Sequence, residues 1–227
     1  FVTDMLVLEI TIDDSIIDVR RTDNPWLSRA AQSLAEALRL TASKKLDVEF
    51  TELVTGYRLR TGMDASYVDI YLYDSLSSGA GYAASVAEAI GELLFDMRER
   101  LSSCDCGSAC SKCLKHYRNQ YIHGLLDRFS ALELLNWGIG GIIRPPIKIE
   151  KQLEMIMPLT NILGQSGCTI LVENGQIMAK SSHLEKRVVI YPAMWVEPHK
   201  DNMIFISDAY VKYAKPYAVQ KIIDSIY

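Results

Sequence analysis

The sequence lacks any apolar run long enough to cross a lipid bilayer. Its longest one, Leu134–Ile143, has ten residues and already contains Asn136, whereas a spanning helix needs about twenty. The sequence also lacks a strong excess of either charge. It contains 24 basic and 28 acidic residues, which gives a net charge of −4. We therefore expect no membrane contact and no globally basic nucleic-acid coat protein, although a local basic patch is compatible with these numbers.

Familiar catalytic motifs are absent as well. The chain has no Walker phosphate-binding loop of the form G-x-x-x-x-G-K-[ST], no D-E-x-H box and no H-x-K-x4-D spacing of phospholipase D-type nucleases. The sequence therefore identifies no catalytic residue and leaves open whether the parent protein is an enzyme. Because the chain opens on Phe1 and not on Met, we expect it to be the C-terminal part of a longer protein.

Cysteine is scarce outside one short stretch. Cys168 stands alone, whereas the other four lie within ten residues in a C-x-C-x3-C-x2-C pattern: Cys104, Cys106, Cys110 and Cys113. An odd total, together with the lack of an N-x-S/T site and of a signal peptide, indicates a reducing cytoplasm, where disulfides are rare. Four thiols so close together predict a metal site, and a closed set of four thiolates favours tetrahedral zinc. An iron–sulfur cluster is the less favoured alternative.

A basic segment follows the cysteines. Lys112, Lys115 and Arg118 are interleaved with aromatic rings, among them Tyr117, and no acidic residue occurs from 107 to 126. Cations contact phosphates and rings stack on bases, so these four residues are the candidate nucleic-acid site. A structural role is the alternative, because four thiolates around Zn²⁺ leave a net negative charge that nearby lysines would offset.

Hydrophobic periodicity predicts an α/β fold. Residues 4–12, 46–53 and 67–73 are typical of strands, and residues 25–42 and 83–101 of amphipathic helices. This order favours a mixed sheet covered by helices, into which the four-cysteine zinc loop is inserted.

Two further helices are expected over 111–123 and 128–137, before a break rich in glycine and proline that we take as a domain boundary. The predicted domains are 1–143, a zinc-binding α/β domain in which acidic residues predominate, and 144–227, a smaller α+β domain with a basic balance and no assigned role. In the second domain, Asn174-Gly175 between two short strands predicts a hairpin.

The segment from Asp74 to Tyr82 joins a strand to a helix and contains Gly79 and Gly81. Such a turn could present backbone N–H groups to a phosphate. We favour the structural interpretation, in which Asp74 or a serine caps the helix that follows.

Several short motifs occur in an order that resembles one known family. They are Thr3-Asp4-Met5-Leu6, Trp26-Leu27-Ser28, Tyr73-Asp74, Ser78-Gly79-Ala80-Gly81-Tyr82, the four-cysteine pattern with Leu114, and Leu126-Asp127-Arg128-Phe129. Together they resemble the MrfA-like zinc-binding domain, found at the C-terminus of certain superfamily 2 DNA helicases and in helicase-associated proteins of bacterial anti-phage systems. The resemblance covers about residues 3–137. It implies that the four cysteines hold one zinc ion. It also implies that an ATP-driven motor, with its ATP and magnesium, lies upstream or in a partner subunit.

The resemblance leads to two hypotheses from different classes. In the first, the chain is a zinc-binding accessory module of an ATP-dependent DNA helicase or helicase-associated protein, in anti-phage defence or DNA repair. It would brace the motor and guide single-stranded DNA, and its partners would be DNA and the motor domains. In the second, the zinc-stabilised fold is a scaffold that docks a partner subunit without DNA contact. Both hypotheses place the protein in the cytoplasm.

Overall fold

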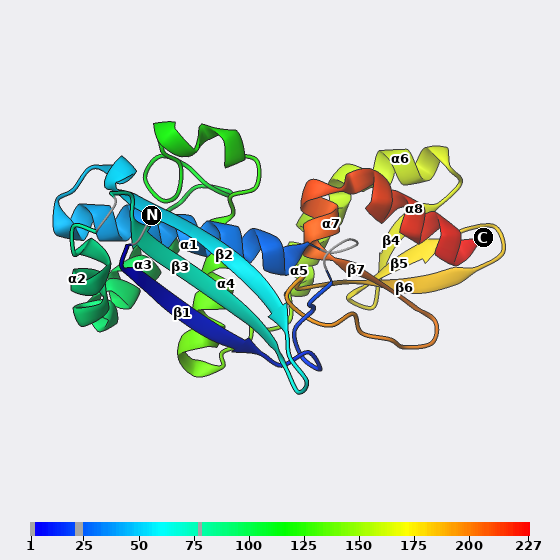
Figure 1. Cartoon of the computed structure of the whole chain (residues 1–227). Helices are drawn as coiled ribbons and strands as arrows, with labels where there is room; N and C mark the ends of the chain where they lie inside the picture. The colour runs from blue at the N-terminus through cyan, green and yellow to red at the C-terminus, as the bar shows by residue number, and fades with distance from the viewer. Residues whose placement is uncertain (1–2, 21–24, 77–78) are drawn as a thin grey trace. The chain divides into compact units, whose positions relative to one another are not determined.

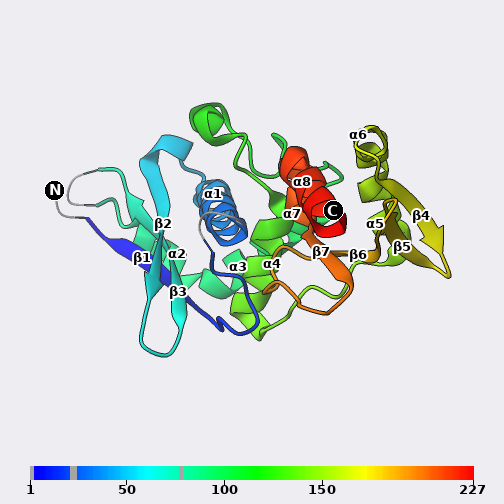
Figure 2. The same ribbon diagram turned by 90° about the vertical axis from the view of Figure 1, so that its right-hand side faces the viewer.

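A computed structural model describes residues 3–20, 25–76 and 79–227 of the chain (Figure 1, Figure 2). Helices and strands both contribute to the architecture, and helices pack against each of two sheets, so the predicted α/β class is confirmed. Among the described residues, no helix has both the length and the apolar character needed to pass through a membrane.

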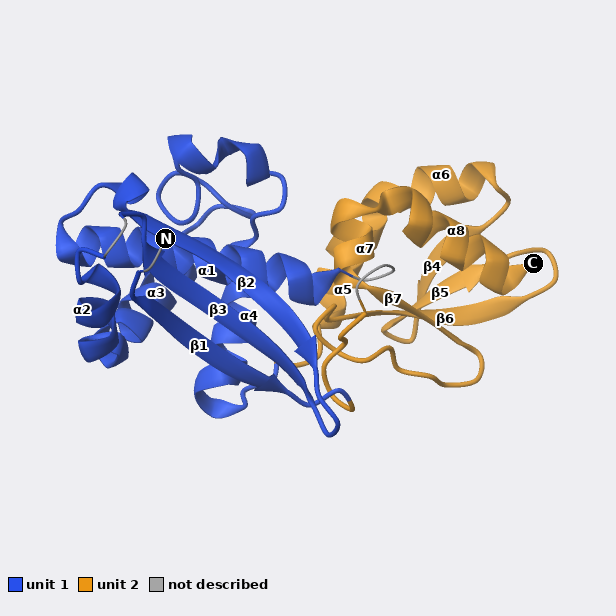
Figure 3. Ribbon diagram, viewed as in Figure 1, with its two compact units in different colours: residues 1–14, 25–143 blue, residues 15–24, 144–227 orange. Residues whose placement is uncertain are grey.

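The chain divides into two compact units (Figure 3). The first consists of residues 1–14 and 25–143, and the second of residues 15–24 and 144–227. The predicted domains were continuous, so they differ from these units in the placement of residues 15–24. Each unit has its own sheet and its own buried apolar residues.

The first unit is built on a three-stranded sheet. Strand β3 (Ser66–Asp74) lies in the centre, between β1 (Met5–Ile12) and β2 (Leu53–Thr61). Val68 and Ile70 of β3 point to the same face and are fully buried, as the alternation in the sequence predicts. Both pairings are antiparallel, so the mixed sheet predicted for this unit is wrong in that detail. The short connection between β2 and β3 forces them to run in opposite directions.

Three helices cover one face of this sheet, as Figure 2 shows: α1 (Trp26–Leu46), α3 (Ile90–Ser103) and α4 (Arg128–Gly140). Leu34 of α1 and Leu93 of α3 are fully buried in the resulting core. The helices thus provide the apolar layer that a sheet needs on at least one side.

The predicted strand over 46–53 is wrong. The end of α1 occupies its first position, Asp47 follows with a φ of 53°, and the 3-10 turn η1 (Phe50–Glu52) completes the segment. Glu49 and Glu52 form a capping box that satisfies the backbone N–H groups of this turn. The alternation of acidic and apolar residues therefore arises from a capped turn and not from a strand.

The second unit contains the mixed sheet. Its strands are β4 (Thr169–Glu173), β5 (Gln176–Lys180), β6 (Glu185–Tyr191) and β7 (Met203–Ser207), in that spatial order. The first three strands pair antiparallel, whereas β6 and β7 run parallel. Asn174 and Gly175 have φ values of 50° and 71° between β4 and β5, so the predicted hairpin is confirmed.

Helical segments supply the rest of this unit. They are α5 (Ile149–Ile156), η3 (Met157–Leu159), α6 (Thr160–Gln165), α7 (Asp208–Tyr213) and α8 (Lys215–Ile226). Side chains from these helices and from the sheet form one core, in which Ile177 and Ile206 are fully buried.

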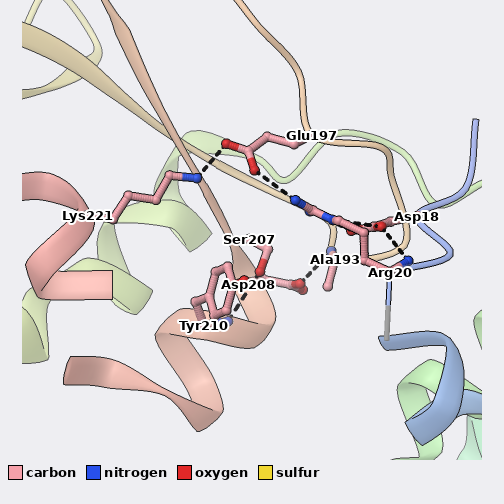
Figure 4. A network of polar contacts seen from close by, with 8 residues as sticks. All are labelled: Asp18, Arg20, Ala193, Glu197, Ser207, Asp208, Tyr210 and Lys221. Atoms are coloured by element: carbon pink, nitrogen blue, oxygen red, sulfur yellow. Dashed lines mark hydrogen bonds and ion pairs between the residues drawn. The ribbon is translucent and has the colours of Figure 1, made fainter. Parts of the chain in front are cut away.

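Residues 15–20, which follow β1, belong to the second unit and are held in it by a chain of polar contacts (Figure 4). The backbone N–H of Asp18 donates to the Met194 carbonyl at 2.9 Å, and the Asp18 carboxylate pairs with Arg20 at 2.6 Å. Glu197 then bridges Arg20 and Lys221. The charges alternate in sign along this chain, so each one faces an opposite neighbour. Such long-range pairing has no local signature in the sequence.

Candidate metal centre

The four cysteines come together where helix α3 ends. The chain leaves the helix after Ser103 and folds into a loop in which the sulfurs of all four cysteines lie within 4.8 Å of one another. Cys113 is fully buried, whereas the other three are half-buried. A single short segment therefore supplies a complete ligand set.

Their spacing fits one tetrahedral zinc ion. Four sulfurs at a Zn–S distance of about 2.3 Å stand about 3.8 Å apart. The observed separations are 3.5 Å for Cys104–Cys110, 3.6 Å for Cys106–Cys113 and 3.8 Å for Cys110–Cys113. All exceed the disulfide bond length of about 2.05 Å, and the cysteines are free thiols. The donor set is soft and closed, which suits a structural zinc ion.

Arg128 braces this loop from the start of α4. Its side chain, only 7% exposed, donates from Nε to the Cys106 carbonyl and from Nη1 to the Leu101 carbonyl, both at 2.9 Å. Its backbone N–H donates to the Ser108 carbonyl at 2.8 Å. Arg128 thus joins α3, α4 and the cysteine loop. The sequence analysis assigned it no role, because contacts across 22 and 27 residues leave no periodic signal.

Replacing Arg128 with lysine is expected to lower the free energy of unfolding by about 2 kcal/mol, because lysine keeps the charge but cannot donate to both carbonyls at once. Chemical denaturation of the zinc-loaded chain would measure the loss. Arg98→Lys, at an exposed position of α3, is the matched control and should change stability by less than about 0.5 kcal/mol. Equal stability of the two variants would contradict the bracing role.

Protons compete with a metal for these thiols. Burial raises the pKa of the Cys113 thiol to about 12 and also raises the pKa of Cys106. The backbone N–H of Lys112 donates toward the Cys110 sulfur and lowers the pKa of that thiol to about 7. Since zinc binds thiolates, it must displace the remaining protons, and its affinity is expected to rise with pH.

A cavity of about 750 Å³ opens beside the cluster. Lys44, Arg100 and Lys112 are among the residues that line it, together with three of the cysteines. Arg100 also donates to the Lys112 carbonyl at 3.3 Å, which ties α3 to the loop. Cations at this position can offset the negative charge of a zinc–thiolate group, in line with the structural alternative for Lys112.

Of the predicted nucleic-acid residues, Lys112 lies between the ligands Cys110 and Cys113, and the other three follow the last cysteine. Lys112, Tyr117 and Arg118 are exposed, and Lys115 is half-buried. In Figure 1 this part of the chain is drawn in green, next to α1. Cations and a ring are therefore exposed to solvent within and directly after the stretch that holds the metal ligands.

Residues 111–123 do not form the predicted helix. The Cys110 carbonyl accepts N–H groups from the three residues 113–115, at 2.9 to 3.1 Å. This tight turn places sulfurs around a common centre, which a regular helix would not do. The 3-10 helix η2 (Tyr117–Ile122) follows, and the His116 side chain caps its first turn.

The glycine-containing turn after β3 is structural, as the sequence analysis favoured. The fully buried Asp74 carboxylate accepts the N–H groups of Ala80 at 2.6 Å, Tyr82 at 3.1 Å and Ala83 at 2.9 Å. It therefore caps α2 (Tyr82–Glu88) and occupies the N–H groups that a phosphate would need. The two serines at 77–78 lie outside the described residues.

The chain is similar to known proteins both in its zinc-binding segment and along most of its length. Residues 29–114 match the family described as the MrfA Zn-binding domain. The chain is 32% identical over 218 residues to the Druantia protein DruE of Escherichia coli (strain UMEA 4076-1), with 91% of this chain and 12% of that protein covered. A crystal structure of the DUF1998 helicase MrfA bound to DNA matches with a TM-score of 0.41 and 17% identity, over 52% of this chain and 15% of that one.

The matched family segment contains all four clustered cysteines, so the resemblance and the zinc cofactor expected from the sequence are confirmed. The match covers 12% of the length of the Druantia relative, so this chain corresponds to about an eighth of that protein.

Proposed function

We propose that this chain is the accessory module of an ATP-dependent DNA helicase or of a helicase-associated protein, because residues 29–114 match the MrfA Zn-binding domain. The similarity to a Druantia protein supports a role in anti-phage defence, with DNA repair as the alternative setting. ATP and magnesium belong to motor domains outside these 227 residues, in the same chain or in a partner subunit. With DNA as its partner, the proposed location of the protein is the cytoplasm.

One observation carries this proposal, namely four thiols at zinc-binding distances within the matched segment. The ligands in the proposal are Cys104, Cys106, Cys110 and Cys113. A bound zinc ion would supply a fixed tetrahedral centre and no catalytic chemistry, because four protein ligands leave no open position. The loop then acts as a rigid brace for the motor domains and for the segment that follows it.

We place the DNA contact on that segment, at Lys112, Lys115, Arg118 and Tyr117. Three of these side chains are cations, and the segment from 107 to 126 itself contains no acidic residue. Lys112 and Arg118 are exposed and therefore accessible to a DNA backbone. In this proposal the segment, which starts at the metal centre, guides a single strand past the motor.

Single-stranded DNA is expected to bind the purified chain in a salt-dependent way. Changing Lys112, Lys115 and Arg118 together to alanine should lower the slope of log affinity against log salt by about 2, since each phosphate contact on a single strand contributes about 0.7. Fluorescence anisotropy with a labelled oligo(dT) at several salt concentrations measures both quantities. As a control, changing the exposed Lys148, Lys200 and Lys215 of the second unit to alanine should preserve the slope.

The second candidate function is a protein-interaction scaffold, and the sheet of the first unit favours it. Met5 is 59% exposed and Val7 49% exposed on β1, an apolar surface that a partner subunit could cover. Partner binding that is unaffected by the triple alanine change, with no binding of single-stranded DNA, would support the scaffold over the DNA-guiding module.

A further inference from the structure

Strand β1 forms one edge of the first sheet, whose strand order is β1-β3-β2 (Figure 1). On an edge strand, the N–H and C=O groups of alternate residues point away from the sheet and can pair with a further strand. We propose that a second copy of this chain adds its own β1 to this edge, antiparallel and with two-fold symmetry about Val7. The inference concerns a surface of the first unit and is independent of the DNA contact proposed above.

The hydrogen bonds of β3 fix which residues of β1 point outward. Ser75, directly after β3, donates its N–H to the Glu52 carbonyl at 2.8 Å, so the odd-numbered residues of β3 bond with β2. The even-numbered residues of β3 therefore bond with β1, where even-numbered residues lie opposite them. Met5, Val7 and Glu9 are left pointing away from the sheet. Within the part of the chain that the structure describes, no hydrogen bond from outside the β1–β3 pair reaches the backbone of these three residues.

The side chains of β1 are also incompletely buried. On the face that the helices cover, Leu6 and Leu8 are only half-buried. Their register partners on β3, Leu72 and Ile70, are fully buried on the same face. On the opposite face, Val7 is 49% exposed. An added strand would cover the flank of these side chains and pair the outward backbone groups at the same time.

The other edge of the sheet is protected in a way that β1 is not. Strand β2 carries Arg58 and Arg60, and charged side chains on an edge strand oppose pairing with another chain. Strand β1 contains no lysine, arginine or proline, and its single acid, Glu9, is ion-paired with Arg60 of the same chain. Pairing at β1 therefore leaves no charge of this strand without a partner.

The available part of the edge is short and centred on one residue. Trp137 of α4 donates from Nε1 to the Thr11 carbonyl at 2.8 Å and so occupies the edge at that end of the strand. The outward backbone groups that remain in β1 are those of positions 5, 7 and 9, which are symmetric about Val7. A symmetric partner can therefore pair with all of them.

The sequence of β1 is complementary to itself in this orientation. Val7 lies opposite the partner's Val7, and Met5 lies opposite the partner's Glu9. On the helix-covered face, Leu6 meets the partner's Leu8. No two carboxylates face each other, although like charges directly opposite would destabilise a strand pair. A second copy brings this complementary set with it, whereas the strand of another protein would have to supply one of its own.

The test measures the mass of the full, zinc-loaded chain by size-exclusion chromatography with light scattering over a range of concentrations. The wild-type chain should form a dimer that dissociates on dilution. Val7→Lys and Val7→Glu should each weaken association about tenfold, because position 7 then faces a like charge on the partner. An equimolar mixture of the two variants should restore the dimer, since a lysine then faces a glutamate.

Two controls separate pairing from folding. Val7→Thr keeps a β-branched side chain and should dimerise as the wild-type chain does. Val172→Lys, at a position that is 55% exposed on the edge strand β4 of the second sheet, is the matched control and should leave the dimer unchanged. Zinc content and unfolding temperature of the Val7 variants should equal those of the wild-type chain, since the Val7 N–H does not bond with β3.

Three results would overturn the inference. The first is a wild-type chain that stays monomeric at the highest concentration measured. The second is a dimer that persists in both charged Val7 variants, because it would then form through another surface. The third is a dimer that both variants lose and that their mixture does not restore, because position 7 would then not face its own copy. DNA binding is decided separately, by the triple alanine experiment.

Discussion

Replacing Cys110 with serine is expected to release the zinc ion and to unfold the segment from Leu101 to His123. A serine hydroxyl is a poor zinc ligand, and a structural zinc site contributes on the order of 10 kcal/mol to folding. That amount is comparable with the whole net stability of a typical domain, about 5–15 kcal/mol. Metal analysis of the purified variant and its thermal unfolding curve measure the two effects directly.

The structure indicates how the damage would spread beyond the loop. Cys113 and Leu114 are fully buried, so a loosened loop exposes both of them. Arg128 would lose the Cys106 carbonyl as an acceptor, and Asn119 would lose the Leu114 carbonyl. Helices α3 and α4 are therefore expected to lose stability together with the loop.

Cys168→Ala is the control for this experiment, since Cys168 is an equally buried thiol in the core of the second unit. It should keep one zinc ion per chain and lose only about 1 kcal/mol of stability. A Cys110→Ser chain that unfolds at the wild-type temperature would show that the loop does not depend on a metal. Since zinc displaces protons from the thiols, the wild-type chain should release its metal more readily as the pH falls.

Replacing Asp74 with alanine is expected to cost about 3 kcal/mol or more. The change leaves three backbone N–H groups of the turn and of helix α2 without their acceptor, and each unsatisfied group costs about 1–3 kcal/mol when buried. It also removes a negative charge from the helix N-terminus, where the helix dipole favours one. Urea denaturation of the zinc-loaded chain would report the loss as a lower midpoint with an unchanged slope.

Two companion variants make this result specific. Asp74→Asn keeps one acceptor oxygen near the turn and should lose less stability than the alanine variant. Asp64→Ala removes an exposed carboxylate between β2 and β3 and should change stability by less than about 0.5 kcal/mol. If Asp74→Ala were as stable as Asp64→Ala, the capping role of the buried carboxylate would be refuted.

Features that depend on neighbouring residues were predictable. The four metal ligands lie within ten residues, so their spacing alone indicated a common site, and the sulfur separations agree with it. The Asn174-Gly175 turn was predictable for the same reason, because positive φ is a property of those two residues. The alternation in β3 likewise identified its buried face.

Features that depend on distant residues were not. Nothing local indicates that Arg128 holds the Cys106 carbonyl, that Asn119 is tied to Glu36 across 83 positions, or that Arg20 pairs with Glu197 across 177. The antiparallel pairing of β1 with β3 was missed because it joins strands that lie far apart in the sequence. The turn within residues 111–123 was missed because the Cys110 carbonyl gathers three N–H groups there in place of a regular helix. Periodicity reports which face of an element is apolar, whereas the partner of a polar side chain is selected only when separate elements pack together and exclude water between them.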